Sequence, residues 1–401
     1  EEDDTMPAIP VSDPVGVIGA GTMGSGIAQV AAAAGHPVLL FDTADGAAAK
    51  GIQSIGKALE RVVAKGRMEE HDRQALLDRI TPCATFEDLR PAKFVIEVVV
   101  ENLEVKRQVF GQLDDLFDAD VILASNTSSI SITAMGRDLK HPERLVGAHF
   151  FNPAPLMALV EVISGLATDK AAAETVFATM EAWGKSPVDC ISTPGFVVNR
   201  VARPYYIEAQ RVLSEGAADP ATIDAVQREA GGFRMGPFEL MDLIGNDINY
   251  TVTCALFEAF GSEQRYAPPL PQQDLMDAGR LGRKTGHGFY DHAEGAEKPA
   301  PHTAEPGPKP ANVRIDGGLG IADSLVARIT DAGIPCENNP GSEKHGGRIV
   351  IDGATLCLTD GRSATQRAAE EGLDDLVVFD LALDFGVASR VAIAAADQAG
   401  A

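Results

Sequence analysis

The sequence predicts a parallel-sheet α/β domain at the N-terminus, an all-α second domain and a small α/β domain at the C-terminus. Three observations support this order. Short apolar runs alternate with helical stretches up to about residue 192, strand signals are missing from 193–292, and they return from residue 313. Continuous apolar runs are typical of parallel strands buried on both faces. We therefore predict domains at 14–192, 193–292 and 313–401, with a stiff Ala/Pro/Glu-rich linker at 293–312.

The individual elements follow from hydrophobic pattern and turn residues. Residues 1–13 are expected to form a loose leader. In the first domain, the Ala-rich stretch 27–34 predicts a helix that ends at Gly35. The predicted strands of the two α/β domains are 15–18, 38–41, 94–100, 121–124, 145–151, 313–315, 348–351 and 376–379. The predicted helices that follow are about 196–213, 220–230, 237–260 and 387–398.

Composition and charge limit the classes of partner. The chain has 401 residues and a formal net charge of −24, which argues against nucleic acids and anionic membranes as general partners. Its five cysteines are widely spaced without a CxxC pair, so we expect reduced thiols in the cytoplasm and no metal site. No apolar run reaches the roughly 18 residues of a membrane helix, and the acidic start is unlike a signal peptide.

A glycine motif after the first predicted strand indicates a dinucleotide site. Gly19, Gly21 and Gly24 form GxGxxG between a strand and a helix, and the next strand ends at Asp42. In the Rossmann arrangement these glycines allow a tight turn, approach to the pyrophosphate and close helix packing, while the acid binds the ribose. Asp42 would repel a 2′-phosphate, which favours NAD over NADP. A structural glycine turn or an FAD site would show the same pattern.

A histidine and a glutamate in apolar surroundings form a second candidate site. His149 lies in a strand-like run, where a lone histidine is more often an ordinary core residue. Glu161 lies in Leu159-Val160-Glu161-Val162-Ile163, and a carboxylate is costly to bury there without a partner. His149 is a reasonable partner, and such a pair is a common general base. Their spacing alone does not show that they meet.

Six segments in order resemble those of the 3-hydroxyacyl-CoA dehydrogenase family over residues 14–292. They are Ser125-Asn126-Thr127-Ser128-Ser129, His149-Phe150-Phe151-Asn152-Pro153, Leu159-Val160-Glu161-Val162-Ile163, Pro194-Gly195-Phe196-Val197-Val198-Asn199-Arg200, Met235-Gly236-Pro237-Phe238-Glu239-Leu240 and Gly282-Arg283-Lys284-Thr285-Gly286-His287-Gly288-Phe289-Tyr290. The resemblance implies NAD-dependent oxidation of an (S)-3-hydroxyacyl-CoA to the 3-oxoacyl-CoA.

The resemblance also implies the role of each catalytic residue. His149 would take the proton from the 3-hydroxyl, and Glu161 would orient His149. Ser128 and Asn199 would hydrogen-bond the reacting oxygen or the thioester region.

The same resemblance implies residues that bind the cofactor and the substrate. Glu101 and Lys106, in an ENxxxK segment, and Asn126 would contact the cofactor, although the first two could equally form an ordinary ion pair. Lys65, or else Lys57, would hold a phosphate of the acyl-CoA.

Longer bacterial members, of the 3-hydroxybutyryl-CoA and phenylacetate-pathway type, extend the resemblance beyond residue 292. They carry a small Rossmann-like segment and then a second helical copy, which this sequence lacks. A homodimer is expected by similarity. The second glycine-rich turn, Gly318-Leu319-Gly320, has Asp323 where a third glycine would stand and is predicted to be structural.

Two other function classes remain as alternatives. A β-hydroxyacid dehydrogenase would need a catalytic lysine near Asn199, where the sequence has Asn and Arg. A non-catalytic member of the same family would keep the fold alone. For the dehydrogenase itself, the resemblance implies 3-hydroxybutyryl-CoA or the dicarboxylic 3-hydroxyadipyl-CoA as the substrate, in fatty-acid or aromatic-acid degradation.

Overall fold

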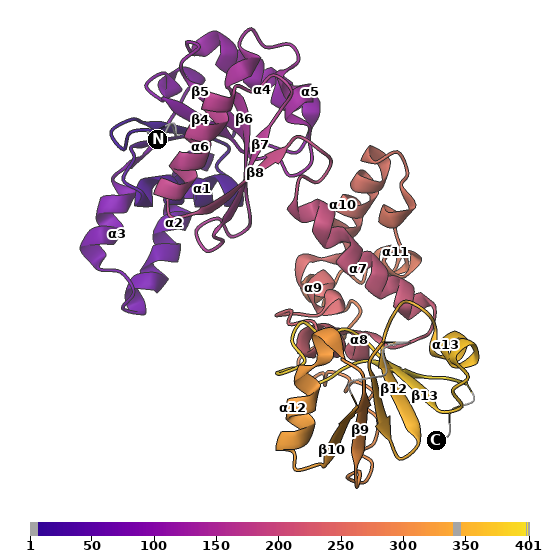
Figure 1. The fold of residues 1–401 in the computed structure, drawn as a ribbon. Helices are drawn as coiled ribbons and strands as arrows, with labels where there is room; N and C mark the ends of the chain where they lie inside the picture. Colours follow the sequence, from indigo (N-terminus) through magenta and orange to yellow (C-terminus); the bar gives the residue numbers. More distant parts are fainter. Residues whose placement is uncertain (1–6, 340–345, 398, 400–401) are drawn as a thin grey trace, which may run out of the picture. The chain divides into compact units, whose positions relative to one another are not determined.

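The computed structural model describes residues 7–339, 346–397 and 399. The chain divides after Ala202 into two compact units, with the N-terminal unit in indigo to magenta and the C-terminal unit in magenta to yellow in Figure 1. Helix α7 (Val198–Ser214) crosses the boundary.

The first unit is built on an eight-stranded sheet with the order β3-β2-β1-β4-β5-β6-β7-β8. The six strands from β3 to β6 are mutually parallel, β7 runs antiparallel to β6, and β8 is parallel to β7. The strand order reverses between β1 and β4, which is where open α/β sheets bind ligands. The strands are β1 Val15–Ile18, β2 Val38–Phe41, β3 Ile80–Pro82, β4 Phe94–Glu97, β5 Ile122–Ser125, β6 Leu145–Phe150, β7 Leu159–Ser164 and β8 Ser186–Ile191.

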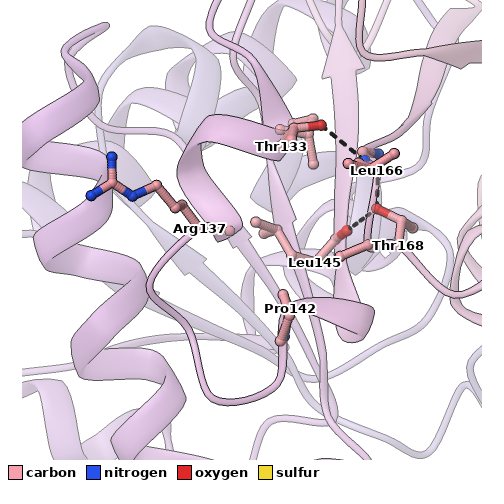
Figure 2. Close-up of a pocket in the computed structure, with 10 residues that line it drawn as sticks. Thr133, Arg137, Pro142, Leu145, Leu166 and Thr168 are labelled. Atoms are coloured by element: carbon pink, nitrogen blue, oxygen red, sulfur yellow. Dashed lines mark hydrogen bonds between the residues drawn. The ribbon is translucent and has the colours of Figure 1, made fainter.

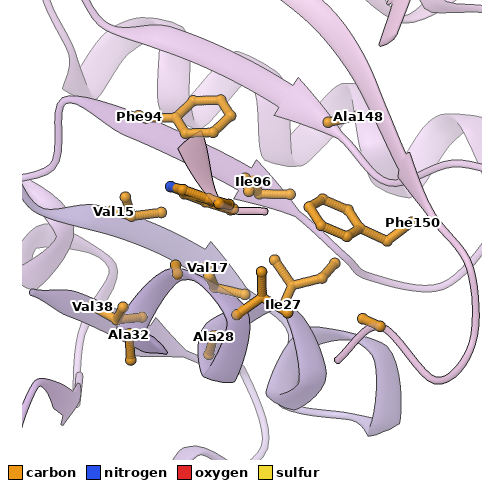
Figure 3. Packing of buried hydrophobic residues seen from close by; sticks show 14 of the residues in the cluster. Val15, Val17, Ile27, Ala28, Ala32, Val38, Phe94, Ile96, Ala148 and Phe150 are labelled. Atoms are coloured by element: carbon orange, nitrogen blue, oxygen red, sulfur yellow. The ribbon is translucent and has the colours of Figure 1, made fainter. Parts of the chain in front are cut away.

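Helices cover both faces of this sheet. Residues of α1, α2 and α6 form one buried cluster with the sheet, and residues of α4 and α5 form the other. Figure 3 shows Ile27, Ala28 and Ala32 of α1 against the apolar side chains of the sheet. The small side chains on this face let the helix lie close to the strands. The helices are α1 Thr22–Ala33, α2 Ala47–Ala64, α3 Glu70–Leu77, α4 Leu103–Leu116, α5 Ile132–Gly136 and α6 Lys170–Ala182.

The second unit combines a helical part with a smaller sheet. The helices after α7 are α8 Pro220–Glu229, α9 Pro237–Ile244, α10 Asn246–Ala259, α11 Leu270–Asp277, α12 Ser324–Asp331 and α13 Ala364–Glu371. The sheet has the order β10-β9-β11-β12-β13-β14 and mixes parallel with antiparallel pairs. Its strands are β9 Val313–Asp316, β10 Cys336–Asn339, β11 Arg348–Ile351, β12 Ala354–Leu358, β13 Leu376–Phe379 and β14 Ile393–Ala395.

The predicted fold class is confirmed, and several elements need correction. No helix covers the described part of 387–398; that alanine-rich segment instead supplies β14, which pairs with β13. Edge pairing overrides its helical composition. The helix predicted over 237–260 is two helices, because Gly245 adopts a φ of 104° between α9 and α10. Strand β4 ends at Glu97 rather than at residue 100.

The segment predicted as a linker, 293–312, contains neither helix nor strand. It contacts the helical part through His302 and Lys298. The His302 amide donates to the Thr222 hydroxyl over 2.8 Å, and the Lys298 ammonium forms an ion pair with Glu239. The second glycine turn is closed by Asp323, whose carboxylate accepts from the Leu319 amide over 2.8 Å. This contact supports the structural role predicted for the turn, which stays a prediction. Within the described residues, no helix is long and apolar enough to cross a membrane.

One buried carboxylate, that of Asp242, bonds the segment 289–292 to the helical part. Asp242, 1% exposed, accepts hydrogen bonds from the Phe289 and Tyr290 amides, the Asn246 side chain and His292, each over 2.9 Å. These contacts join residues 289–292 to α9, which holds Asp242, and link α9 to the start of α10.

Replacing this carboxylate should therefore destabilise the second unit. We expect Asp242→Ala to lower the free energy of unfolding by about 3 kcal/mol or more, because two backbone amides lose their buried acceptor. Asp291→Ala removes an exposed carboxylate from the same loop and should cost about 1 kcal/mol or less. Urea unfolding measures both, and equal losses would contradict the role given to Asp242.

Candidate active site

The glycine turn after β1 has the geometry of a dinucleotide cradle. Gly19 has a φ of 106°, and a Cβ there would lie 2.5 Å from the Val98 carbonyl oxygen. A Cβ at Gly24 would lie 1.8 Å from the Gly19 carbonyl oxygen, so only glycine allows α1 to start so close to the turn. A Cβ at Gly21 would meet no protein atom within 4 Å, which leaves space beside the backbone.

The start of α1 and the end of β2 complete this cradle. Gly21 is the N-cap residue of α1 and has no capping side chain, so the first N–H groups of the helix suit a phosphate. The Asp42 carboxylate accepts from the Ala20 amide over 2.7 Å and from the Ala44 amide over 2.9 Å. These residues fit the pyrophosphate and ribose of NAD.

The predicted contact between His149 and Glu161 is present. The two residues are cross-strand partners in the antiparallel pair β6–β7, and Nδ1 of His149 lies 2.7 Å from Oε2 of Glu161. Both side chains are buried, with exposed fractions of 6% and 0%. Because an ionised carboxylate only accepts, Nδ1 of His149 is the donor in this contact, and in a neutral imidazole Nε2 is then the acceptor.

Glu161 is also held by the start of α7. Its Oε1 accepts from the Val197 and Val198 amides over 2.9 and 2.8 Å. Phe196 reaches this position with a φ of 48°, and its ring lies 6.0 Å from that of His149. Burial raises the pKa of Glu161, but the hydrogen bonds from His149 and the two amides outweigh burial and hold the pKa below its usual value. The carboxylate is therefore ionised at neutral pH.

The turn after β5 is organised around Glu101. One carboxylate oxygen of Glu101 accepts from the Thr127 hydroxyl over 2.6 Å and from the Ser128 and Ser129 amides over 2.9 and 3.0 Å. Burial raises the pKa of Glu101, yet these hydrogen bonds and the nearby Lys106 ammonium bring it below its ordinary value. Glu101 stays partly exposed, with 39% of its side chain open.

Lys106 lies beneath this turn, with 1% of its side chain exposed. Its ammonium is 2.7 Å from Oε1 of Glu97 and 3.5 Å from Oε2 of Glu101. Glu97 is not among the residues predicted from the sequence, although a carboxylate after the apolar run Phe94-Val95-Ile96 gives the same signal that singled out Glu161.

The remaining predicted residues lie on three elements. The Asn126 side-chain carbonyl accepts from the Phe150 amide over 2.8 Å, which links the end of β5 to β6. Ser128 is half-buried in the turn beside Glu101, and Asn199 lies in the first turn of α7. Lys57 and Lys65 are both exposed, on α2 and at its C-cap. Lys57 lines a cavity of about 510 Å³ between α2 and α3.

Of two other cavities in the first unit, one adjoins the His149–Glu161 pair. The cavity of about 200 Å³ in Figure 2 is lined by Leu145, Thr133 and Thr168, among others. Thr133 accepts from the Leu166 amide and Thr168 donates to the Leu145 carbonyl, so both hydroxyls are already engaged. A groove of about 790 Å³ includes Phe196 and Val197 in its lining and so adjoins the His149–Glu161 pair.

Comparisons with known proteins agree with this geometry. Residues 14–193 match the family profile described as "3-hydroxyacyl-CoA dehydrogenase, NAD binding domain", and residues 195–292 match the C-terminal domain of the same enzyme family. The chain belongs to the 3-hydroxyacyl-CoA dehydrogenase family. Residues 356–401 match the "3-hydroxybutyryl-CoA dehydrogenase reduced Rossmann-fold domain". The family resemblance inferred from six motifs and the choice of NAD are confirmed.

Named relatives of this family share much of the sequence. The 3-hydroxyadipyl-CoA dehydrogenase of Escherichia coli K12 is 51% identical over 277 residues, which is 69% of this chain and 58% of that protein. The 3-hydroxybutyryl-CoA dehydrogenase of Clostridioides difficile is 41% identical over 69% of this chain and 98% of its own length. The chain thus spans little more than half the length of the first relative and nearly all of the second.

A solved structure extends the match to the small sheet. The crystal structure of 3-hydroxybutyryl-CoA dehydrogenase from Escherichia coli K12 has a TM-score of 0.85 and 42% sequence identity. The match covers 98% of this chain and 76% of that chain.

The glycine turn gives a direct test of cofactor binding. We expect Gly21→Ala to leave the melting temperature nearly unchanged and to weaken NADH at least tenfold, because the new methyl group enters space open to the pyrophosphate. Gly24→Ala should lower both stability and affinity, because its Cβ meets the Gly19 carbonyl oxygen.

Gly111→Ala is the matched control, since that glycine lies within α4 and its Cβ meets no atom within 4 Å. It should bind NADH normally. Fluorescence titration measures the affinity, and unchanged binding by Gly21→Ala would remove the cradle assignment.

Proposed function

We propose that this chain oxidises (S)-3-hydroxyacyl-CoA to 3-oxoacyl-CoA with NAD. The observation that supports the proposal most is the buried contact between His149 and Glu161, 2.7 Å apart, in the same unit as the glycine cradle. An imidazole with a carboxylate on Nδ1 is arranged to receive a proton at Nε2. The family relationship supplies the substrate class.

His149 takes the proton of the 3-hydroxyl at Nε2, and Glu161 stabilises the imidazolium that forms. Because Glu161 is held from two sides, by His149 and by the Val197 and Val198 amides, it orients the ring without moving during the reaction. When bound, NAD would accept the hydride that leaves C3, so that one proton and one hydride together leave the alcohol. Ser128 and Asn199 position the reacting oxygen.

The same proposal assigns the residues that bind the cofactor and the substrate. Asp42 holds the ribose, Glu101 contacts the nicotinamide ribose side, and Asn126 fixes the β5–β6 edge beside it. Lys106 supports Glu101 from within the protein, since 1% of its side chain is exposed and its ammonium lies 3.5 Å from Oε2 of Glu101. Lys65 or Lys57 holds a CoA phosphate, and the cavity lined by Lys57 favours the latter. We also propose a cytoplasmic homodimer.

Glutamine variants of both members test the catalytic pair, with a surface histidine as the control. His149→Gln and Glu161→Gln should lower kcat roughly 10²- to 10⁴-fold, because the proton acceptor or its partner is lost, while NADH affinity stays nearly unchanged. NADH absorbance with acetoacetyl-CoA measures the rate. His141→Gln is the control, since His141 also pairs with a carboxylate, Glu143 at 3.1 Å, but at the surface. Full activity of His149→Gln would refute the mechanism.

The acyl chain is tested by a specificity series. The chain is 51% identical to the 3-hydroxyadipyl-CoA dehydrogenase of Escherichia coli and 41% identical to the 3-hydroxybutyryl-CoA dehydrogenase of Clostridioides difficile, which favours a dicarboxylic substrate. We therefore expect kcat/KM for 3-hydroxyadipyl-CoA to exceed that for 3-hydroxybutyryl-CoA by tenfold or more. A wild-type enzyme that prefers the four-carbon substrate would reverse this assignment and leave the reaction class intact.

A further inference from the structure

We infer that Glu97 is a positioning residue that holds the cofactor-facing Glu101 and the turn 125–129 in place from within the core. The inference rests on the proposed function, because Glu101 and Ser128 face ligands only if that function is correct. Glu97 ends β4 and is fully buried. It pairs in register with Ile18, the last residue of β1, so it lies where the strand order reverses.

Each oxygen of this carboxylate holds a different part of the site. Oε1 of Glu97 accepts from Nζ of Lys106 and from the Val99 amide, both over 2.7 Å. Oε2 accepts from the Ser125 hydroxyl over 2.7 Å. One side chain thus joins the end of β4, the first turns of α4 and the end of β5.

The contacts of both Glu97 oxygens continue to Glu101, one through Lys106 and the other through Ser125 and Thr127. Lys106, fixed by Glu97, lies 3.5 Å from Oε2 of Glu101. Ser125, also fixed by Glu97, accepts from the Thr127 amide over 3.2 Å, and the Thr127 hydroxyl donates to Oε1 of Glu101 over 2.6 Å. The two oxygens of Glu101 are therefore set by two routes that start at one buried carboxylate.

Packing of the core alone does not explain a carboxylate at position 97. The other β4 side chains, Phe94, Val95 and Ile96, are apolar and fully buried. An apolar residue at position 97 would continue that pattern, whereas burying an ammonium and a carboxylate carries a desolvation cost that often cancels the gain. The pair gives the site two fixed polar anchors that apolar packing cannot supply.

The test compares two buried ion pairs, each of which has one member on α4. Glu97→Gln removes the charge that faces Lys106, whereas Asp114→Asn removes the charge that faces Arg144, 2.8 Å away near the other end of α4. Both variants should lower the melting temperature. We expect Glu97→Gln alone to weaken NADH at least tenfold by fluorescence titration and to raise the KM for NADH more than it lowers kcat.

A second variant tests the role of Glu97 if Glu97→Gln does not fold. Ser125→Ala keeps the Glu97–Lys106 contact and cuts only the branch to Thr127, so it should weaken NADH about fivefold. Its control is Ser192→Ala, which removes a hydroxyl that accepts from the Ile132 amide over 2.9 Å.

The inference is overturned if Glu97→Gln binds NADH within twofold of Asp114→Asn. If Glu97→Gln does not fold, Ser125→Ala binding within twofold of Ser192→Ala overturns it instead. NADH binding does not depend on the acyl-CoA reaction. A wild-type chain that binds NADH but does not reduce acetoacetyl-CoA would therefore refute the proposed function without deciding the role of Glu97.

Discussion

The register between β6 and β7 is the constraint on which the site depends. His149 and Glu161 face each other because the two strands pair antiparallel in that register. A slip of one residue in either strand would turn the side chain of that strand to the opposite face of the sheet and separate the pair. The neighbours Ala148, Val160 and Val162 are buried in the core cluster, so the same slip would also expose apolar surface. Core packing and the geometry of the proposed base are therefore set together.

The sheet order brings the other parts of the site to the same edge. β1, β4, β5 and β6 are consecutive neighbours and mutually parallel. The glycine turn follows β1, Glu97 and Glu101 lie at and beyond the end of β4, the turn 125–129 follows β5, and His149 lies near the end of β6. Four segments spread over about 130 positions of sequence thus meet at the carboxyl ends of adjacent strands, as the topology of an open α/β sheet requires.

Patterns that depend on neighbouring residues could be read from the sequence, and contacts set by tertiary packing could not. The GxGxxG turn and Asp42 were found because strand, glycine spacing and acid all lie within one βαβ unit. The alanine-rich end was misassigned because its place at a sheet edge depends on β13, about 15 residues earlier. Glu97 was missed because its partners, Lys106 and Ser125, are 9 and 28 residues away. Each of the two belongs to a recognisable motif, but nothing in either motif indicates a contact with Glu97.

The four carboxylates of the site have one property in common, which is that backbone amides hold each of them. The donors are Ala20 and Ala44 to Asp42, Val99 to Glu97, Ser128 and Ser129 to Glu101, and Val197 and Val198 to Glu161. Because the main chain fixes their directions, these side chains lose little further freedom when ligands bind, and less of the binding energy is spent on ordering them. This arrangement also places fixed charge near a reacting centre before the reaction begins, which is the form in which electrostatic stabilisation is most effective.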